Sequence, residues 1–154
     1  MSKLLQKPAA GAQRHNITPA SAGWEHVGFA QYALQAEEQL SCQQDGRELC
    51  VVILTGRADV QVGDQSWSAI GGRDDLFADQ PPAAVYVPAG ESAEIKATEA
   101  AEIAVCSAPG AGNSGPARLI DPATMSQEVR GQGTNTRYVR NILPETEPAD
   151  GLLV

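Results

Sequence analysis

Short apolar segments recur along most of this chain, separated by turn residues about every 8–12 positions. Residues 49–54 form an apolar run that is too short for a helix, and residues 58–62 and 93–97 alternate apolar with polar side chains. Gly63-Asp64 separates two of these segments by two residues, as in a β-hairpin. Fifteen glycines and ten prolines favour turns over long helices. The pattern predicts an all-β fold, an antiparallel β-sandwich or barrel.

The expected strands divide the chain into one domain and two flanking segments. Residues 1–22 are polar, alanine-rich and without period, which predicts an irregular N-terminal arm. Residues 23–143 form the β domain, with strands expected at 26–34, 49–54, 58–62, 65–70, 83–87, 93–97, 101–105 and 137–143. Residues 144–154 combine an acidic, proline-rich linker with an apolar end. We expect this end to begin a strand toward a second domain; the alternative is a short tail that docks on the sheet.

The charge balance excludes several functional classes. Lysine and arginine number 11 and aspartate and glutamate 19, which gives a net charge of −8. A general nucleic-acid-binding protein needs a basic face, and so does a polybasic membrane anchor, so this charge argues against both classes. No apolar run approaches the ~20 residues that span a bilayer, and the start has no secretory apolar region. Three cysteines without CxxC spacing are expected to be reduced core residues in a cytoplasmic protein.

The chain has few residues with which to build a metal site. Its two histidines, His15 and His26, are too few for a site of three histidines, so no metal is expected in this chain alone. Glu25 and Glu48 precede expected strands, and each is expected to be an exposed carboxylate.

One stretch concentrates groups that could bind an acid. Residues 130–140 contain three arginines in an otherwise acidic chain, and Arg130, Asn135 and Arg137 are the candidate substrate-binding residues. The guanidinium fork matches a carboxylate, which favours a sugar acid as ligand. The alternative is a set of local salt bridges in an acidic domain.

The stretch 85–90 (VYVPAG) resembles the second half of the cupin signature, a strand followed by a tight Pro-x-Gly turn. In metal-binding cupins a histidine follows that glycine by three residues, and here the position holds Ala93. The strand ending at Gly56 resembles the first half of the signature, but only Glu48 corresponds to its ligands. The resemblance implies a cupin, a jelly-roll-like β fold, without the cupin metal site.

Five longer stretches, residues 15–19, 24–29, 50–59, 101–109 and 133–145, resemble the 5-deoxy-glucuronate isomerase family of bacterial inositol catabolism. The 5-keto-4-deoxyuronate isomerases share that family. Its members are bicupins whose C-terminal cupin carries the metal-binding histidines and glutamate. The resemblance spans residues 15–154 and implies that this chain is the N-terminal cupin of a bicupin.

The family reaction turns 5-deoxy-D-glucuronate into 5-keto-2-deoxy-D-gluconate, an aldose–ketose isomerisation. A divalent metal, Zn or Mn, polarises the substrate oxygens while a base moves the proton. The resemblance implies that this metal lies in the C-terminal cupin and that the present chain alone is inactive. The alternatives are a metal-free cupin that binds a sugar acid and an assembly module. We expect a sugar acid and a second cupin or second copy as partners, and neither nucleic acid nor membrane.

Overall fold

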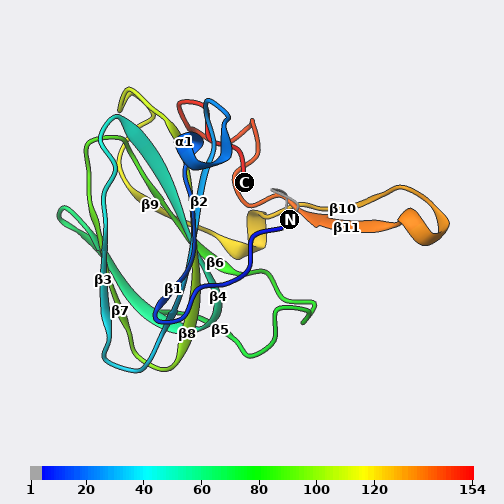
Figure 1. The fold of residues 1–154 in the computed structure, drawn as a ribbon, viewed down its shortest axis with the longest axis horizontal. Coiled ribbons are helices and arrows are strands. Elements are labelled where there is room, and N and C mark those ends of the chain that lie inside the picture. Colours follow the sequence, from blue (N-terminus) through cyan, green and yellow to red (C-terminus); the bar gives the residue numbers. More distant parts are fainter. Residues whose placement is uncertain (1–4) are drawn as a thin grey trace.

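The computed structural model describes residues 5–154 and consists mainly of antiparallel strands, which confirms the predicted all-β class (Figure 1). Nine strands belong to one sheet that folds into two layers, and two more form a separate hairpin. The strands are β1 (Gln13–Ile17), β2 (Gly28–Leu34), β3 (Gln39–Cys42), β4 (Arg47–Val62), β5 (Gln65–Arg73), β6 (Ala83–Val87), β7 (Ala93–Ala97), β8 (Ala101–Pro109), β9 (Arg118–Ile120), β10 (Gln127–Arg130) and β11 (Arg137–Arg140), with one short helix, α1 (Pro19–Ala22).

Strand β4 joins the two layers. Its first half pairs with β6 and β8, and its second half pairs with β5 and β7. The change of partners occurs at Gly56, whose φ is 74°. A Cβ at this position would lie 2.1 Å from the carbonyl oxygen of Ala100, so only glycine fits the bend. This bend allows a single 16-residue strand to form part of both layers.

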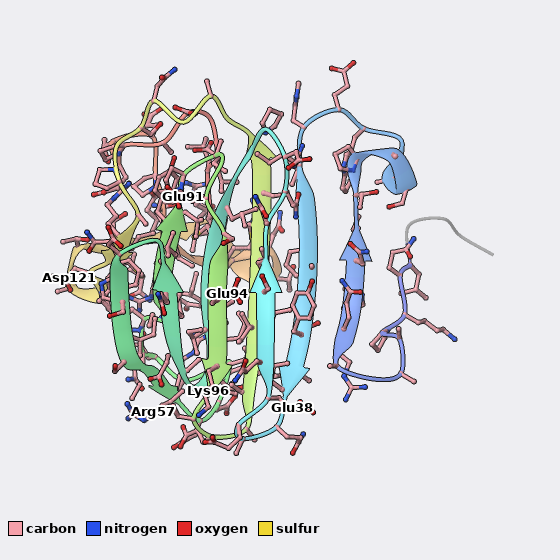
Figure 2. All side chains as sticks on the ribbon, turned by 90° about the vertical axis from the view of Figure 1, so that its left-hand side faces the viewer. Glu38, Arg57, Glu91, Glu94, Lys96 and Asp121 are labelled. Carbon is pink, nitrogen blue, oxygen red and sulfur yellow. The ribbon has the colours of Figure 1, made fainter. Side chains whose placement is uncertain are left out.

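The space between the layers is filled by apolar side chains. Along the first half of β4, Leu49, Val51 and Ile53 point into this inner core, whereas Cys50 and Val52 lie on the opposite face. On β7, alanine and isoleucine side chains point inward, and Glu94 and Lys96 point outward, as the alternation predicts (Figure 2). The barrel interior is therefore an apolar core.

The outer face of the β2-β8-β4-β6-β9 layer is also covered. A second apolar cluster forms there between strand residues and the C-terminal segment, including Leu143 and Leu152. The backbone N–H of Val154 donates to the carbonyl oxygen of Leu143 at 3.1 Å, and the amides of Ile142 and Leu143 donate back to Val154. Residues 151–154 thus lie against the domain and form no strand, in contrast to the expected start of a strand.

The N-terminal segment also differs from the expectation of an irregular arm. Residues 13–17 form β1, which pairs with β2 at the edge of the sheet, and residues 19–22 form α1. Side chains of an edge strand remain partly exposed on both faces, so β1 lacks the alternation that marks a half-buried strand. Strands β3 and β9 are short and were likewise not predicted.

The β10–β11 hairpin extends away from the two layers (Figure 1). The expected strand at 137–143 is present only as far as Arg140 and pairs with β10 rather than with the main sheet. Before the hairpin, Asp121 caps the 3₁₀ turn Pro122–Thr124, and its carboxylate accepts the Ala123 N–H at 2.9 Å.

Candidate functional site

The barrel interior does not fit a metal ion. Ala93, at the position of the cupin histidine, is fully buried in the inner core. Among residues 5–154, no group of three or more His, Cys, Asp or Glu side chains could hold a metal. His26 is 74% exposed and lies beside Glu25, and His15 lies on the edge strand β1. The ligands that the cupin fold uses for a metal are therefore absent from the described barrel.

The three cysteines are free, as predicted, and Cys42 and Cys50 are buried. Burial raises the pKa of the Cys42 thiol to about 11 and raises the pKa of Cys50 further. Both side chains are therefore protonated at neutral pH and act as small apolar residues.

Glu48 is fully buried, so the prediction of an exposed carboxylate is wrong. Its position on β4 has the same parity as Cys50 and Val52, which places the carboxylate on the outer face of the layer rather than in the barrel. The C-terminal segment covers this face and supplies the hydrogen bonds that a buried charge requires.

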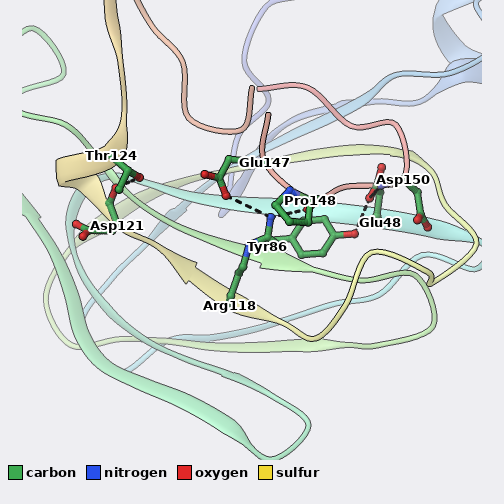
Figure 3. Close-up of polar contacts among 8 residues, drawn as sticks. All are labelled: Glu48, Tyr86, Arg118, Asp121, Thr124, Glu147, Pro148 and Asp150. Atoms are coloured by element: carbon green, nitrogen blue, oxygen red, sulfur yellow. Dashed lines mark hydrogen bonds and ion pairs between the residues drawn. The ribbon is translucent and has the colours of Figure 1, made fainter. Parts of the chain in front are cut away.

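Four donors surround the Glu48 carboxylate, and Figure 3 draws the two residues Tyr86 and Asp150 beside it. Its Oε1 accepts the N–H groups of Gly151 at 2.7 Å and Leu152 at 2.5 Å. Its Oε2 accepts the Tyr86 hydroxyl at 2.7 Å and the N–H of Asp150 at 2.9 Å. A charged acceptor strengthens each of these bonds, so Glu48 fastens the C-terminal segment to β4.

The neighbouring side chains extend this network. The guanidinium of Arg118 lies 4.5 Å from the centre of the Tyr86 ring and donates to the carbonyl oxygen of Pro148 (Figure 3). Burial, together with the hydrogen bond to Glu48, raises the pKa of Tyr86 to about 12. The Asp150 carboxylate accepts the Ser114 hydroxyl and backbone amides of the 111–113 loop, which lower its pKa. The polar groups of Glu48, Tyr86 and Asp150 are thus paired within the chain, which indicates a structural role.

A pocket of about 640 Å³ lies on the other part of the same outer face. It is bounded by the β5–β6 loop, residues 74–82, and by the base of the β10–β11 hairpin, which lie near each other in Figure 1. Arg73 ends β5 and Arg140 ends β11, and both line this pocket. Its apolar side includes Leu54 and Ile142, so the pocket combines cationic and apolar walls.

The structure places the three predicted binding residues on the hairpin beyond this pocket. Arg130 and Arg137 are directly opposite each other across the two strands, and Asn135 lies in the turn that joins them. All three are exposed. Arg130 donates to Glu128 at 2.8 Å, the local salt bridge that the alternative expectation describes. These residues are thus together in space but do not line the pocket at the hairpin base.

A model of the KduI/IolB family matches residues 4–154. The chain belongs to the KduI/IolB family. It is 46% identical over 157 residues to the 5-deoxy-glucuronate isomerase of Geobacillus kaustophilus, covering 100% of this chain and 56% of that protein. The corresponding isomerase of Halalkalibacterium halodurans is 34% identical, with 59% of it covered. The chain therefore spans little more than half the length of the curated relatives it matches.

Among solved structures, an IolB-like protein from Salmonella typhimurium LT2 matches with a TM-score of 0.90 and 40% identity. That match covers 96% of this chain and 56% of the other. Oxalate decarboxylase of Bacillus subtilis matches with a TM-score of 0.50 and 20% identity over 69% of this chain and 26% of the decarboxylase, which shows the cupin fold alone. Another structure of that decarboxylase is described with Mn(II) centres. The KduI/IolB chain thus has a cupin fold without residues that fit a metal in the described barrel.

Proposed function

We propose that this chain is the N-terminal cupin of a 5-deoxy-glucuronate isomerase, which converts 5-deoxy-D-glucuronate into 5-keto-2-deoxy-D-gluconate in bacterial myo-inositol catabolism. The observation that supports this most is the 46% identity to an isomerase of which the chain covers about half. The reaction and its pathway are those of the whole relative. We propose the cytoplasm as the location of this chain. No helix of the described residues is long and apolar enough to cross a membrane.

In this proposal the Zn or Mn of the reaction is bound by a second cupin. The support comes from Ala93 at the histidine position and from the absence of a metal-ligand cluster within residues 5–154. The present chain supplies a rigid β scaffold and takes no part in the proton transfer. Alone, with or without added metal, it is inactive.

An isomerase assay with 5-deoxy-D-glucuronate tests this proposal. The chain alone with Mn²⁺ or Zn²⁺ is expected to give no turnover above the blank. Mixing or fusing it with the part of the Geobacillus kaustophilus relative that it does not cover is expected to restore turnover, with the intact relative as control. Turnover by this chain alone would overturn the proposal, and so would an inactive fusion beside an active control.

The second candidate function is that of an assembly module without catalysis. It is favoured by the β10–β11 hairpin, where Val129 and Tyr138 face each other across the strands and remain 63% and 75% exposed. A two-stranded hairpin is marginally stable alone, so contact with a second cupin or a second copy would stabilise it. Light scattering on the purified chain tests whether the hairpin binds a second copy. A monomer at all concentrations would exclude the second copy and leave the second cupin as the partner of the hairpin.

A further inference from the structure

The pocket at the hairpin base combines two arginine side chains, Arg73 and Arg140, with an apolar wall. Its volume of about 640 Å³ is in the range of small-molecule sites. The pocket lies on the outer face of the layer, so a ligand there would not enter the apolar barrel core.

Arg73 takes part in none of the ion pairs of residues 5–154, although the charge of nearby Asp75 acts on it and opposes the lowering of its pKa. Its Nε–H donates to the carbonyl oxygen of Leu54 at 2.8 Å, and Nη1 donates to that of Gln80 at 3.2 Å. A guanidinium has five N–H groups, so these two bonds hold the side chain in place and leave donors for a ligand. Burial and the charge of Arg140 both lower the pKa of Arg73.

Arg140 approaches the same pocket from β11. Its one ion pair is with Asp79 at 3.1 Å, and the Asp79 side chain is 85% exposed. Asp79 also lines the pocket, and an exposed ion pair of this kind contributes little free energy, so a ligand carboxylate can compete with Asp79 for Arg140. The charged residues that line the pocket are Arg73, Arg140 and Asp79, and this excess of positive over negative groups favours an anion.

The remaining lining narrows the kind of anion. The amides of Gln80 and Gln127 can both donate and accept hydrogen bonds, which suits hydroxyl groups. Phe77 and Tyr138 are 94% and 75% exposed, and aromatic rings of this kind pack against the C–H face of a sugar.

We propose that the pocket between Arg73 and Arg140 binds a small polyhydroxylated carboxylate, a sugar acid whose carboxylate lies between the two guanidinium groups. This site is distinct from the predicted one at Arg130, Asn135 and Arg137 on the hairpin. The inference concerns binding by this chain and no turnover, so it can fail while the proposed isomerase function stands, and the reverse.

Calorimetric and NMR titration of the full chain with sodium D-glucuronate tests the site, with D-glucose and inorganic phosphate at matched ionic strength as comparison ligands. Saturable glucuronate binding is expected, with shifts confined to residues 73–82 and 127–142. Loss of one charge-assisted contact in Arg140→Gln is expected to weaken it about tenfold or more. The control Arg57→Gln, on the opposite layer (Figure 2), is expected to bind within about twofold of wild type.

Arg73 also donates to two backbone carbonyl oxygens, so binding by Arg73→Gln is interpreted only if its thermal unfolding matches that of wild type. Gln127→Leu is an independent test of the pocket lining. Absence of saturable glucuronate binding, or full affinity in Arg140→Gln, would overturn the site. Equal binding of phosphate and glucuronate, or of glucose and glucuronate, would overturn the sugar-acid assignment.

Discussion

Replacing Glu48 with alanine tests the role assigned to the C-terminal segment. The substitution removes the acceptor of the Tyr86 hydroxyl and of the amides of Asp150, Gly151 and Leu152. A buried donor that loses its acceptor costs about 1–3 kcal/mol. The Tyr86 and Leu152 donors are buried, whereas water can reach the other two when the segment loosens. We therefore expect Glu48→Ala to lower the free energy of unfolding by about 2–5 kcal/mol.

Urea unfolding followed by tryptophan fluorescence and circular dichroism measures this loss. It is a large part of the total free energy of unfolding of a small domain, which is ~5–15 kcal/mol. Hydrogen exchange locates it, with faster exchange expected at residues 150–152. Glu48→Gln keeps one acceptor oxygen and is expected to lose less. The control Glu25→Gln changes a carboxylate that is 87% exposed and is expected to stay within about 0.5 kcal/mol of wild type. An equally small change in Glu48→Ala, with unchanged exchange at 150–152, would refute the fastening role.

Three further predictions concern stability. Because the pKa of Tyr86 is raised to about 12 from 10.0, the stabilisation that its protonated hydroxyl gives the fold is complete below pH 10 and is lost as the pH rises through 12. Melting temperatures from pH 9 to 12 should therefore fall more steeply in wild type than in Tyr86→Phe. Equal slopes would contradict this. Gly56→Ala should lower the free energy of unfolding, measured in urea, by about 2 kcal/mol or more because its Cβ would overlap Ala100. The control Gly46→Ala, with open space around it, should lower it by about 1 kcal/mol. Similar losses would show that the bend tolerates a side chain. Arg118→Lys loses the planar contact with Tyr86 and should lower stability by about 1 kcal/mol, and no change would show that this contact contributes nothing.

Local patterns predicted the strands with clear periodicity. The alternation at 93–97 and the apolar run at 83–87 correspond to β7 and β6 with the same bounds. The polar edge strand β1 was missed because neither of its faces is fully buried, so no period marks it. Long strand β4 was predicted as two pieces because its bend at Gly56 interrupts the alternation.

The environment of Glu48 depends on contacts that no local pattern contains. Its donors at residues 150–152 lie more than 100 positions away in the chain. A signal was nevertheless present, because Glu48 has the parity of Cys50 and Val52 in a run that predicts burial on both faces. Arg73 and Arg140 likewise meet only through the fold, so the arginine-rich stretch indicated the hairpin but not the pocket at its base.

Under the proposed function, this chain is a cupin that binds no metal. The most direct test is the metal-to-protein ratio by mass spectrometry, after equilibration with Mn²⁺ or Zn²⁺ at neutral pH and removal of free metal. The apolar barrel with Ala93 at the histidine position predicts a ratio near zero for both ions. A ratio near one that survives dialysis would contradict the claim.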